Sequence, residues 1–195
     1  MKACEGLEIA LSYTSVIDST KNRKTCLVTF RLPEELVEDL REESKNTQIS
    51  LNTLANQILN KYVSWERPSG KLGLIQMPRP LVKEIFRDIP NKRIQKMASN
   101  SCKDAIKELV LIKEGNLTLD SFILVFNEWL RASWIVHRYK KNIEGHHYVI
   151  YHNLNKTFSI YLAELFISIL DDLHNYRREI TVRQDSLSIA FAAKP

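Results

Sequence analysis

The fold of this chain is decided by residues 25–65, TCLVTFRLPEELVEDLREESKNTQISLNTLANQILNKYVSW. Because successive side chains of a β-strand face opposite sides, the alternation at the start of this stretch predicts a strand. Pro33 ends the strand, since it has no amide hydrogen to donate to a ladder. One face of the strand is apolar and the other is expected to be exposed: the first carries Cys26, Val28, Phe30 and Leu32, and the second Thr25, Leu27, Thr29 and Arg31.

Two amphipathic helices are predicted after the strand. The acids Glu34 and Glu35 favour a helix start directly after Pro33, because they lie at the positive end of the helix dipole. Ser50 suits the N-cap of the second helix, since its hydroxyl can accept a hydrogen bond from a free backbone amide. The buried stripes are expected to be Leu36, Val37 and Leu40 in the first helix, and Leu51, Leu54, Ala55, Ile58, Leu59, Tyr62 and Val63 in the second.

A unit of this size cannot bury an adequate core alone, and a single strand leaves its backbone hydrogen-bonding groups unpaired. We therefore expect a homodimer, or a higher homo-oligomer, in which two strands pair antiparallel as a ribbon and four helices close beneath it. A two-stranded ribbon fits the major groove of B-form DNA. Double-stranded DNA is thus the expected partner.

Residues 30–40, FRLPEELVEDL, and residues 49–59, ISLNTLANQIL, resemble the ribbon-helix-helix family of repressors, to which the methionine and Arc repressors belong. The resemblance covers about a fifth of the chain. It implies a DNA-binding transcriptional regulator that inserts its ribbon into the major groove. We expect it to act in transcription regulation as a dimeric repressor or activator.

The resemblance also implies roles for individual residues. The base-reading positions of the family match Leu27, Thr29 and Arg31. Arg31 can donate two hydrogen bonds to a guanine edge, whereas Leu27 offers only apolar contact to a thymine methyl. The phosphate contacts of the family match the backbone amides around Ser50, Leu51 and Asn52, and a basic arm before the strand, Lys21, Arg23 and Lys24, is expected to reach further phosphates.

The net charge of the chain and its distribution limit how strongly the sequence supports DNA binding. The chain has a net charge of +5, which permits an anionic partner without identifying it. Residues 1–65 hold 8 Lys or Arg and 9 Asp or Glu, so the positive excess lies elsewhere. Leu27 occupies a position that is usually polar or basic in the family. An alternative is that another segment of the protein covers Leu27 and Thr29, which would leave the ribbon for dimerisation alone.

The sequence predicts an α+β chain in four parts: a flexible N-terminal arm over residues 1–24, the ribbon-helix-helix head over 25–65, a linker over 66–78 rich in Pro and Gly, and a C-terminal domain over 79–195. In that domain three helical segments precede two strands joined across NIEG, a long helix and two closing strands. Gly115 is expected to end the middle helix and Thr118 to cap the next. The strands are expected to form one antiparallel sheet backed by a helix. The domain would serve oligomerisation or effector sensing.

The histidines are the best candidates for chemistry in the C-terminal domain. His137, His146 and His152 lie on the predicted strand pair, and imidazole suits a transition metal. Their spacing matches no metal motif, so a metal-responsive regulator is kept only as an alternative. A second alternative is a protein-interaction module that resembles the partner-binding antitoxins with this type of head.

Other classes of function find little support. No phosphate-binding glycine loop, serine elbow or metalloprotease motif is present, so we expect no enzymatic activity and no cofactor. No run of about eighteen apolar residues predicts a membrane span. The three cysteines are odd in number and widely spaced, which favours a reducing compartment. A cytoplasmic, nucleoid-associated protein is the expectation.

Overall fold

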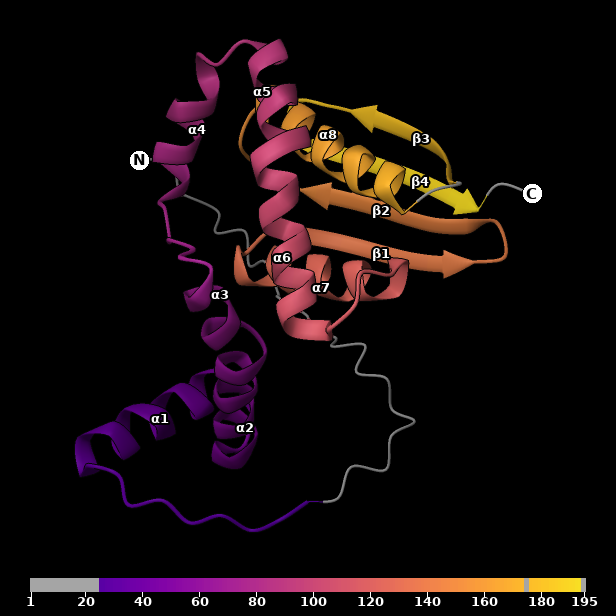
Figure 1. The fold of residues 1–195 in the computed structure, drawn as a ribbon. Helices are drawn as coiled ribbons and strands as arrows, with labels where there is room; N and C mark the ends of the chain where they lie inside the picture. The colour runs from indigo at the N-terminus through magenta and orange to yellow at the C-terminus, as the bar shows by residue number, and fades with distance from the viewer. Residues whose placement is uncertain (1–24, 174–175, 194–195) are drawn as a thin grey trace, which may run out of the picture. The chain divides into compact units, whose positions relative to one another are not determined.

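The computed structural model describes residues 25–173 and 176–193, with α1 to α8 and β1 to β4 labelled along the chain (Figure 1). The chain divides into two compact units, Met1–Gln48 and Ile49–Pro195. Each unit is described by itself. The division falls between the two helices predicted for the head.

In the first unit, residues 25–33 have no regular secondary structure and precede helix α1, Glu34–Asn46. Pro33 is the N-cap residue, and Glu34 and Glu35 occupy the first turn as expected. The strand predicted for residues 25–32 is not formed in the single chain. A strand needs a partner with which to exchange backbone hydrogen bonds, and the described residues supply none at this segment.

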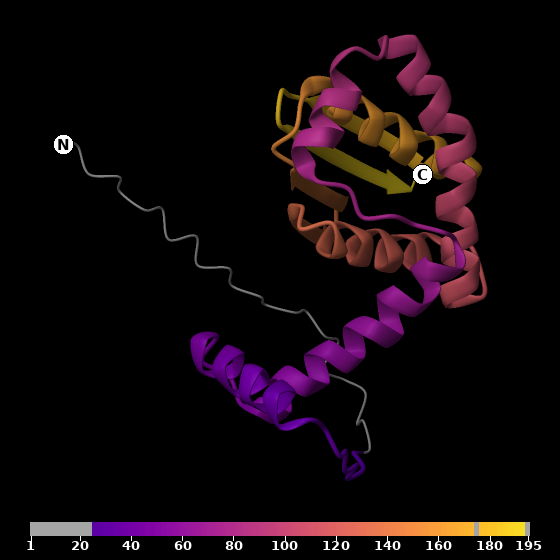
Figure 2. The ribbon, with the colours of Figure 1, turned by 90° about the vertical axis from the view of Figure 1, so that its left-hand side faces the viewer.

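The second unit begins with a long helix made of α2 (Leu51–Lys61), a π-helical turn η1 (Tyr62–Glu66) and α3 (Arg67–Lys71) (Figure 2). The predicted N-cap is confirmed, because the amide of Thr53 donates to Ser50 Oγ at 3.0 Å. The linker predicted for residues 66–78 is wrong in its first half, since helix continues to Lys71. Only residues 74–78 run without helix or turn before α4.

A proline inside this helix explains why the prediction failed. Pro68 has no amide hydrogen, so the carbonyl of Ser64, four residues earlier, loses its helical donor. The ammonium group of Lys113, from a distant helix, donates to that carbonyl instead. The wider π-turn and this substitute donor together allow the helix to continue through Pro68.

The remaining helices agree with the sequence pattern. They are α4 (Arg79–Arg87), α5 (Asn91–Met97), a π-turn η2 (Ala98–Cys102), α6 (Lys103–Glu114) and α7 (Leu119–Ala132). Gly115 ends α6 in the left-handed conformation with φ of 73°, as predicted. Thr118 caps α7 in a reciprocal pair with Ser121, which confirms the predicted cap.

The last part of the chain forms one four-stranded antiparallel sheet. Strands β1 (Val136–Asn142) and β2 (Gly145–Tyr151) make a hairpin, α8 (Lys156–Asp172) follows, and β3 (Tyr176–Val182) and β4 (Ser186–Ala193) make a second hairpin. The order is β1-β2-β4-β3, so the two later strands of the hairpins meet at the centre. The predicted α+β domain with a helix-backed antiparallel sheet is confirmed.

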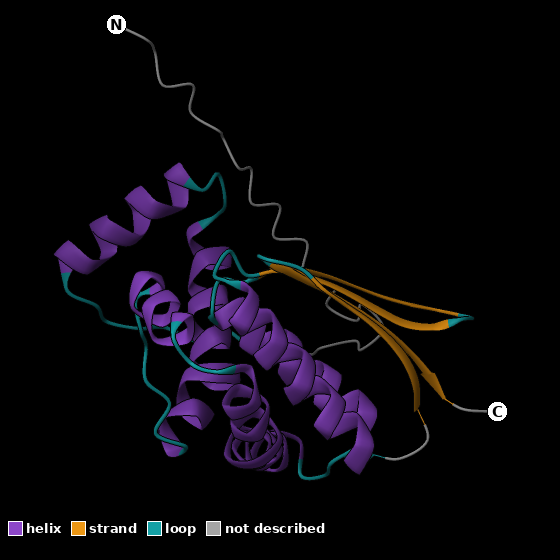
Figure 3. Cartoon of the chain, turned by 90° about the horizontal axis from the view of Figure 1, so that it is seen from above, coloured by secondary structure: helices purple, strands orange, loops and turns teal. Residues whose placement is uncertain are grey.

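The core lies between one face of this sheet and the helices (Figure 3). Tyr148 and Ile150 of β2 are fully buried, and so are Leu187 and Ile189 of β4. Phe166 of α8 is at the centre of an aromatic cluster, with its ring 5.1–5.6 Å from the rings of Phe122, Phe126, Tyr148 and Phe191. Helices α7 and α8 therefore cover one face, and within the described residues of the second unit no element covers the other face, which is called the open face below.

Candidate nucleic-acid interface

The three predicted base readers lie in the extended segment before α1. The side chain of Leu27 is 96% exposed, and Thr29 and Arg31 are also exposed. Within residues 25–48, no side chain covers Leu27 or Thr29.

The apolar residues that alternate with these positions in the segment are exposed as well. Val28 is 59% exposed, Phe30 is 60% exposed and Leu32 is 48% exposed. Large contiguous apolar side chains in water mark a surface that binds another molecule. The apolar and polar residues that alternate in the sequence are therefore all exposed in the single chain, and their separation onto two faces stays a prediction.

Helix α1 is predominantly acidic, with six acids against Arg41 and Lys45. Its acids begin at Glu34 and continue to Glu43, and all six acidic side chains are exposed. Arg31 lies before the first of them, in the extended segment. An acidic helix repels phosphate, so within residues 25–48 the extended segment offers the more suitable surface for DNA.

The predicted phosphate contact lies at the start of α2, in the second unit. Ser50 Oγ accepts from the amide of Thr53, which uses one of the free amides of the first turn. Leu51 and Asn52 occupy the first two helical positions, whose amides have no acceptor within a helix. The positive end of the helix dipole adds to this preference for an anion. Lys21, Arg23 and Lys24 lie outside the described residues.

The three histidines named as metal candidates are each used by the fold in a different way. His137 Nδ1 donates to the carbonyl of Ile135 at 3.0 Å. His146 Nδ1 lies 2.7 Å from the hydroxyl of Tyr139, and its ring stacks on Phe191. His146 and His152 share a face of the sheet but lie six residues apart, about 20 Å along a strand. These two side chains cannot bind one ion, and no cluster of metal-ligating side chains occurs within residues 25–173 and 176–193.

His152 is a structural histidine held between three elements. The amide of Leu154 donates to Nδ1 at 3.1 Å, so the proton of the neutral ring is on Nε2, which donates to Ser159 Oγ at 2.7 Å. Ser159 Oγ in turn lies 3.4 Å from the carbonyl of Ser186. Burial lowers the pKa of His152 to about 4, against a smaller opposing effect of Asp185. Burial is also the main cause that lowers the pKa values of His137 and His146.

A buried lysine that the sequence did not single out fastens the long helix to the rest of the second unit. The side chain of Lys113 is only 6% exposed. It donates to the carbonyl of Ser64 in η1 and pairs with Glu128 of α7. Its ammonium group also lies 5.8 Å from the centre of the Trp65 ring. The partners are 15 and 49 residues away in sequence, so no local pattern could have indicated them.

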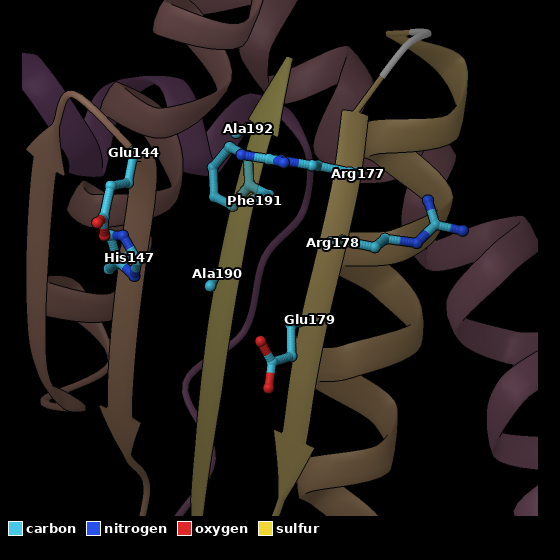
Figure 4. Close-up of a pocket in the computed structure, with 8 residues that line it drawn as sticks. All are labelled: Glu144, His147, Arg177, Arg178, Glu179, Ala190, Phe191 and Ala192. Carbon is cyan, nitrogen blue, oxygen red and sulfur yellow. The ribbon is translucent and has the colours of Figure 1, made fainter. Parts of the chain in front are cut away.

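The open face of the sheet contains a shallow hollow of about 350 Å³ that the sequence analysis also missed (Figure 4). The small side chains of Ala190 and Ala192 on β4 form its floor. His147 lies on the β2 side, and Arg177 and Glu179 lie on the β3 side. The signal was present in the alternation of β4, where Ser186, Ser188, Ala190 and Ala192 all fall on one face.

No helix in the described part of the chain is long and apolar enough to cross a membrane. Comparison with known proteins found no matching family model, no matching curated protein and no matching solved structure. The candidate nucleic-acid interface is therefore assigned from the chemistry and exposure of its own residues.

Proposed function

We propose that this chain is a DNA-binding regulator that dimerises through residues 25–32 and reads DNA with the outward face of the ribbon formed in this way. One observation carries the proposal: residues 25–32 alternate apolar and polar side chains that are all exposed, and their backbone has no ladder partner within the described residues.

Dimerisation would satisfy both needs of the segment at once. Antiparallel pairing with the same segment of a second chain supplies hydrogen-bond partners to the backbone. It also places Val28, Phe30 and Leu32 of both chains on one side, where they can be covered. Full burial of a side chain of this size stabilises by about 1.5–3 kcal/mol. Exposed apolar side chains on α2, among them Ile58 and Leu59, offer further surface for such a core.

The other face of the ribbon would carry the chemistry for reading DNA. Two chains present Arg31 twice, related by two-fold symmetry, which suits an operator with two similar half-sites. Thr29 can bond to a base edge or contact a thymine methyl, and Leu27 contacts a methyl. The free amides at Leu51 and Asn52 would then bind backbone phosphates, which position the protein without reading sequence.

The proposal is tested with the variant Arg31→Ala and the control Arg41→Ala, in which an exposed arginine of α1 is removed instead. A target is first obtained by selecting sites from random DNA at two salt concentrations. Loss of a bidentate guanine contact costs about 1–3 kcal/mol, so Arg31→Ala should weaken specific binding about 10- to 100-fold per contact. Arg41→Ala should bind normally.

Both variants should keep the oligomeric state of the unmodified protein, as measured by sedimentation. Equal affinity and equal sequence preference for the two variants would contradict base reading by Arg31. No DNA binding at low salt, together with a tightly bound protein partner after purification, would favour the protein-interaction module instead. Specific binding that changes with added transition metal would favour the metal-responsive regulator.

A further inference from the structure

The open face of the sheet is built from a row of large side chains beside a row of small ones. The large ones lie on β2 and are His147, Val149 and Tyr151. Their cross-strand neighbours on β4 are small: Tyr151 lies opposite Ser186, Val149 opposite Ser188 and His147 opposite Ala190. The face therefore has a ridge along β2 and a trough along β4, and the hollow in Figure 4 belongs to the trough.

We propose that two copies of this chain pack their open faces together about a two-fold axis that runs parallel to the strands. In that arrangement β2 of one copy lies over β4 of the other, so each ridge enters the opposite trough. Face-to-face sheets pack about 10 Å apart with strands within about 30° of each other, which suits such interdigitation. The proposal does not depend on dimerisation through residues 25–32.

Among the arrangements that keep the strands of the two sheets aligned, the shape of the face disfavours the other two-fold axis. An axis perpendicular to the strands would place β2 over β2 and β4 over β4 of the second copy. His147 and Tyr151 would then meet large side chains, whereas Ala190 and Ser188 would face each other across a void. Voids and overpacking both weaken an interface. Only the parallel axis fills the trough with the ridge.

Charge selects the same arrangement. Lys140 on β1 and Glu179 on β3 belong to one row across the sheet, through His147 and Ala190. The parallel axis brings β1 of one copy over β3 of the other, so Lys140 meets Glu179 of the second copy twice in the dimer. The perpendicular axis would instead bring Lys140 and Arg138 against the same cations of the second copy.

The same pair distinguishes contacts between chains from contacts within one chain. Lys140 and Glu179 lie on the two edge strands, three strand spacings or about 14 Å apart. A link within one chain would need both side chains extended toward each other across β2 and β4, and the isotope mixture described below distinguishes it from a link between two chains. The face spans about 20 Å across its four strands and about 23 Å along them. This is a small interface, so we expect weak association that depends on protein concentration.

The experiment uses zero-length carbodiimide cross-linking of the full chain, prepared as an equal mixture of ¹⁴N- and ¹⁵N-labelled protein. Mass spectrometry should find a link between Lys140 and Glu179 in mixed-isotope form, which identifies it as a contact between chains. Lys141, the next residue on β1, points to the other face and should link to Glu179 at least tenfold less often.

Charge reversal provides the decisive variants. Lys140→Glu alone and Glu179→Lys alone each remove one half of the amine and carboxylate pair, so neither variant can form the link by itself. Mixing the two variants should restore a link between residue 140 of one and residue 179 of the other. Ala190→Trp, which fills the trough but keeps both charges, should lower the link at least tenfold, whereas Ala190→Ser should not.

Circular dichroism establishes that each variant keeps the fold. Absence of the link in the unmodified protein, or no recovery in the mixed variants, would overturn the proposal. Absence of the link, together with protection of the face from labelling only when a single-stranded oligonucleotide is added, would identify nucleic acid as the occupant and would also overturn the proposal.

Discussion

The core around α8 and the segment before α1 use the same kind of side chain in opposite ways. Phe166 is fully buried among four aromatic rings, whereas Phe30 is 60% exposed in water. The core thus satisfies its apolar side chains within one chain. The segment satisfies neither its apolar side chains nor its backbone, and we expect it to do so only with a second chain. Stability should therefore depend strongly on protein concentration in the segment and only weakly in the core, whose proposed association through the open face is weak.

The largest effect is expected from Phe166→Ala in the core. Removal of a fully buried phenylalanine leaves a cavity and costs about 3–5 kcal/mol of the free energy of unfolding. The loss should be the same at low and high protein concentration, as measured by denaturant unfolding. Ile143→Ala, at an exposed turn between β1 and β2, serves as the control and should change stability by less than about 0.5 kcal/mol. A concentration-dependent loss in Phe166→Ala would break the comparison.

Acid should weaken the core through His152. Its folded pKa of about 4 lies below the ordinary value of 6.5, so between these pH values the unfolded chain binds a proton that the folded chain excludes. The free energy of unfolding is therefore highest above pH 6.5 and falls as the pH drops, by up to about 3 kcal/mol from this group. His152→Gln should show a shallower decrease between pH 7 and pH 4. Identical slopes in both proteins would contradict this role.

Phe30→Ala should affect association rather than the core. Loss of its burial in the proposed dimer should weaken that dimer by about 2 kcal/mol per chain. Sedimentation equilibrium measures the change, and the unfolding of the core at low concentration should stay as in the unmodified protein. Leu27→Ala, on the opposite face of the segment, should leave the dimer nearly unchanged. Equal weakening by both variants would show that the two faces are not distinct.

The smallest effect is expected from the helix caps. Thr118→Ala removes the hydrogen bonds shared with Ser121 at the start of α7 and should cost about 1 kcal/mol. Ser50→Ala removes a single capping bond of α2 and should cost about as much or less. Thermal unfolding measures both. A larger loss of unfolding free energy in Ser50→Ala than in Thr118→Ala would contradict this order. It would show that the start of α2 contributes more to stability than its exposed side chains suggest.

Local rules predicted most of the C-terminal domain. Period-two and period-3.6 patterns gave β1 to β4 and α4 to α8, since these elements bury one face each within the same chain. Gly115, Thr118 and Ser50 were predicted as helix ends because their effects are confined to a few neighbouring residues. Such features can be read without knowing the fold.

Two features could not be read in this way. Pro68 predicts that the helix breaks, whereas the π-turn and the donor supplied by Lys113, 49 residues away in sequence, let it continue. The trough on the open face depends on which residues of β2 and β4 lie opposite each other, and register is set by the folded sheet. The sequence predicted which residues the candidate nucleic-acid interface contains. The pairing of residues 25–32 with a second chain stays a prediction.

The unbroken helix from Leu51 to Lys71 bears on how this protein could be divided or recombined. A fragment that ends at the Pro and Gly cluster would carry away Ser64 and Trp65, and Lys113 would be left as a buried cation without its carbonyl partner. Exchange of the N-terminal region for that of another protein would therefore preserve the C-terminal domain only if the cut were made before α2. A gene fusion with its junction at Pro68 would remove the Ser64 carbonyl, so Lys113 would need another hydrogen-bond acceptor.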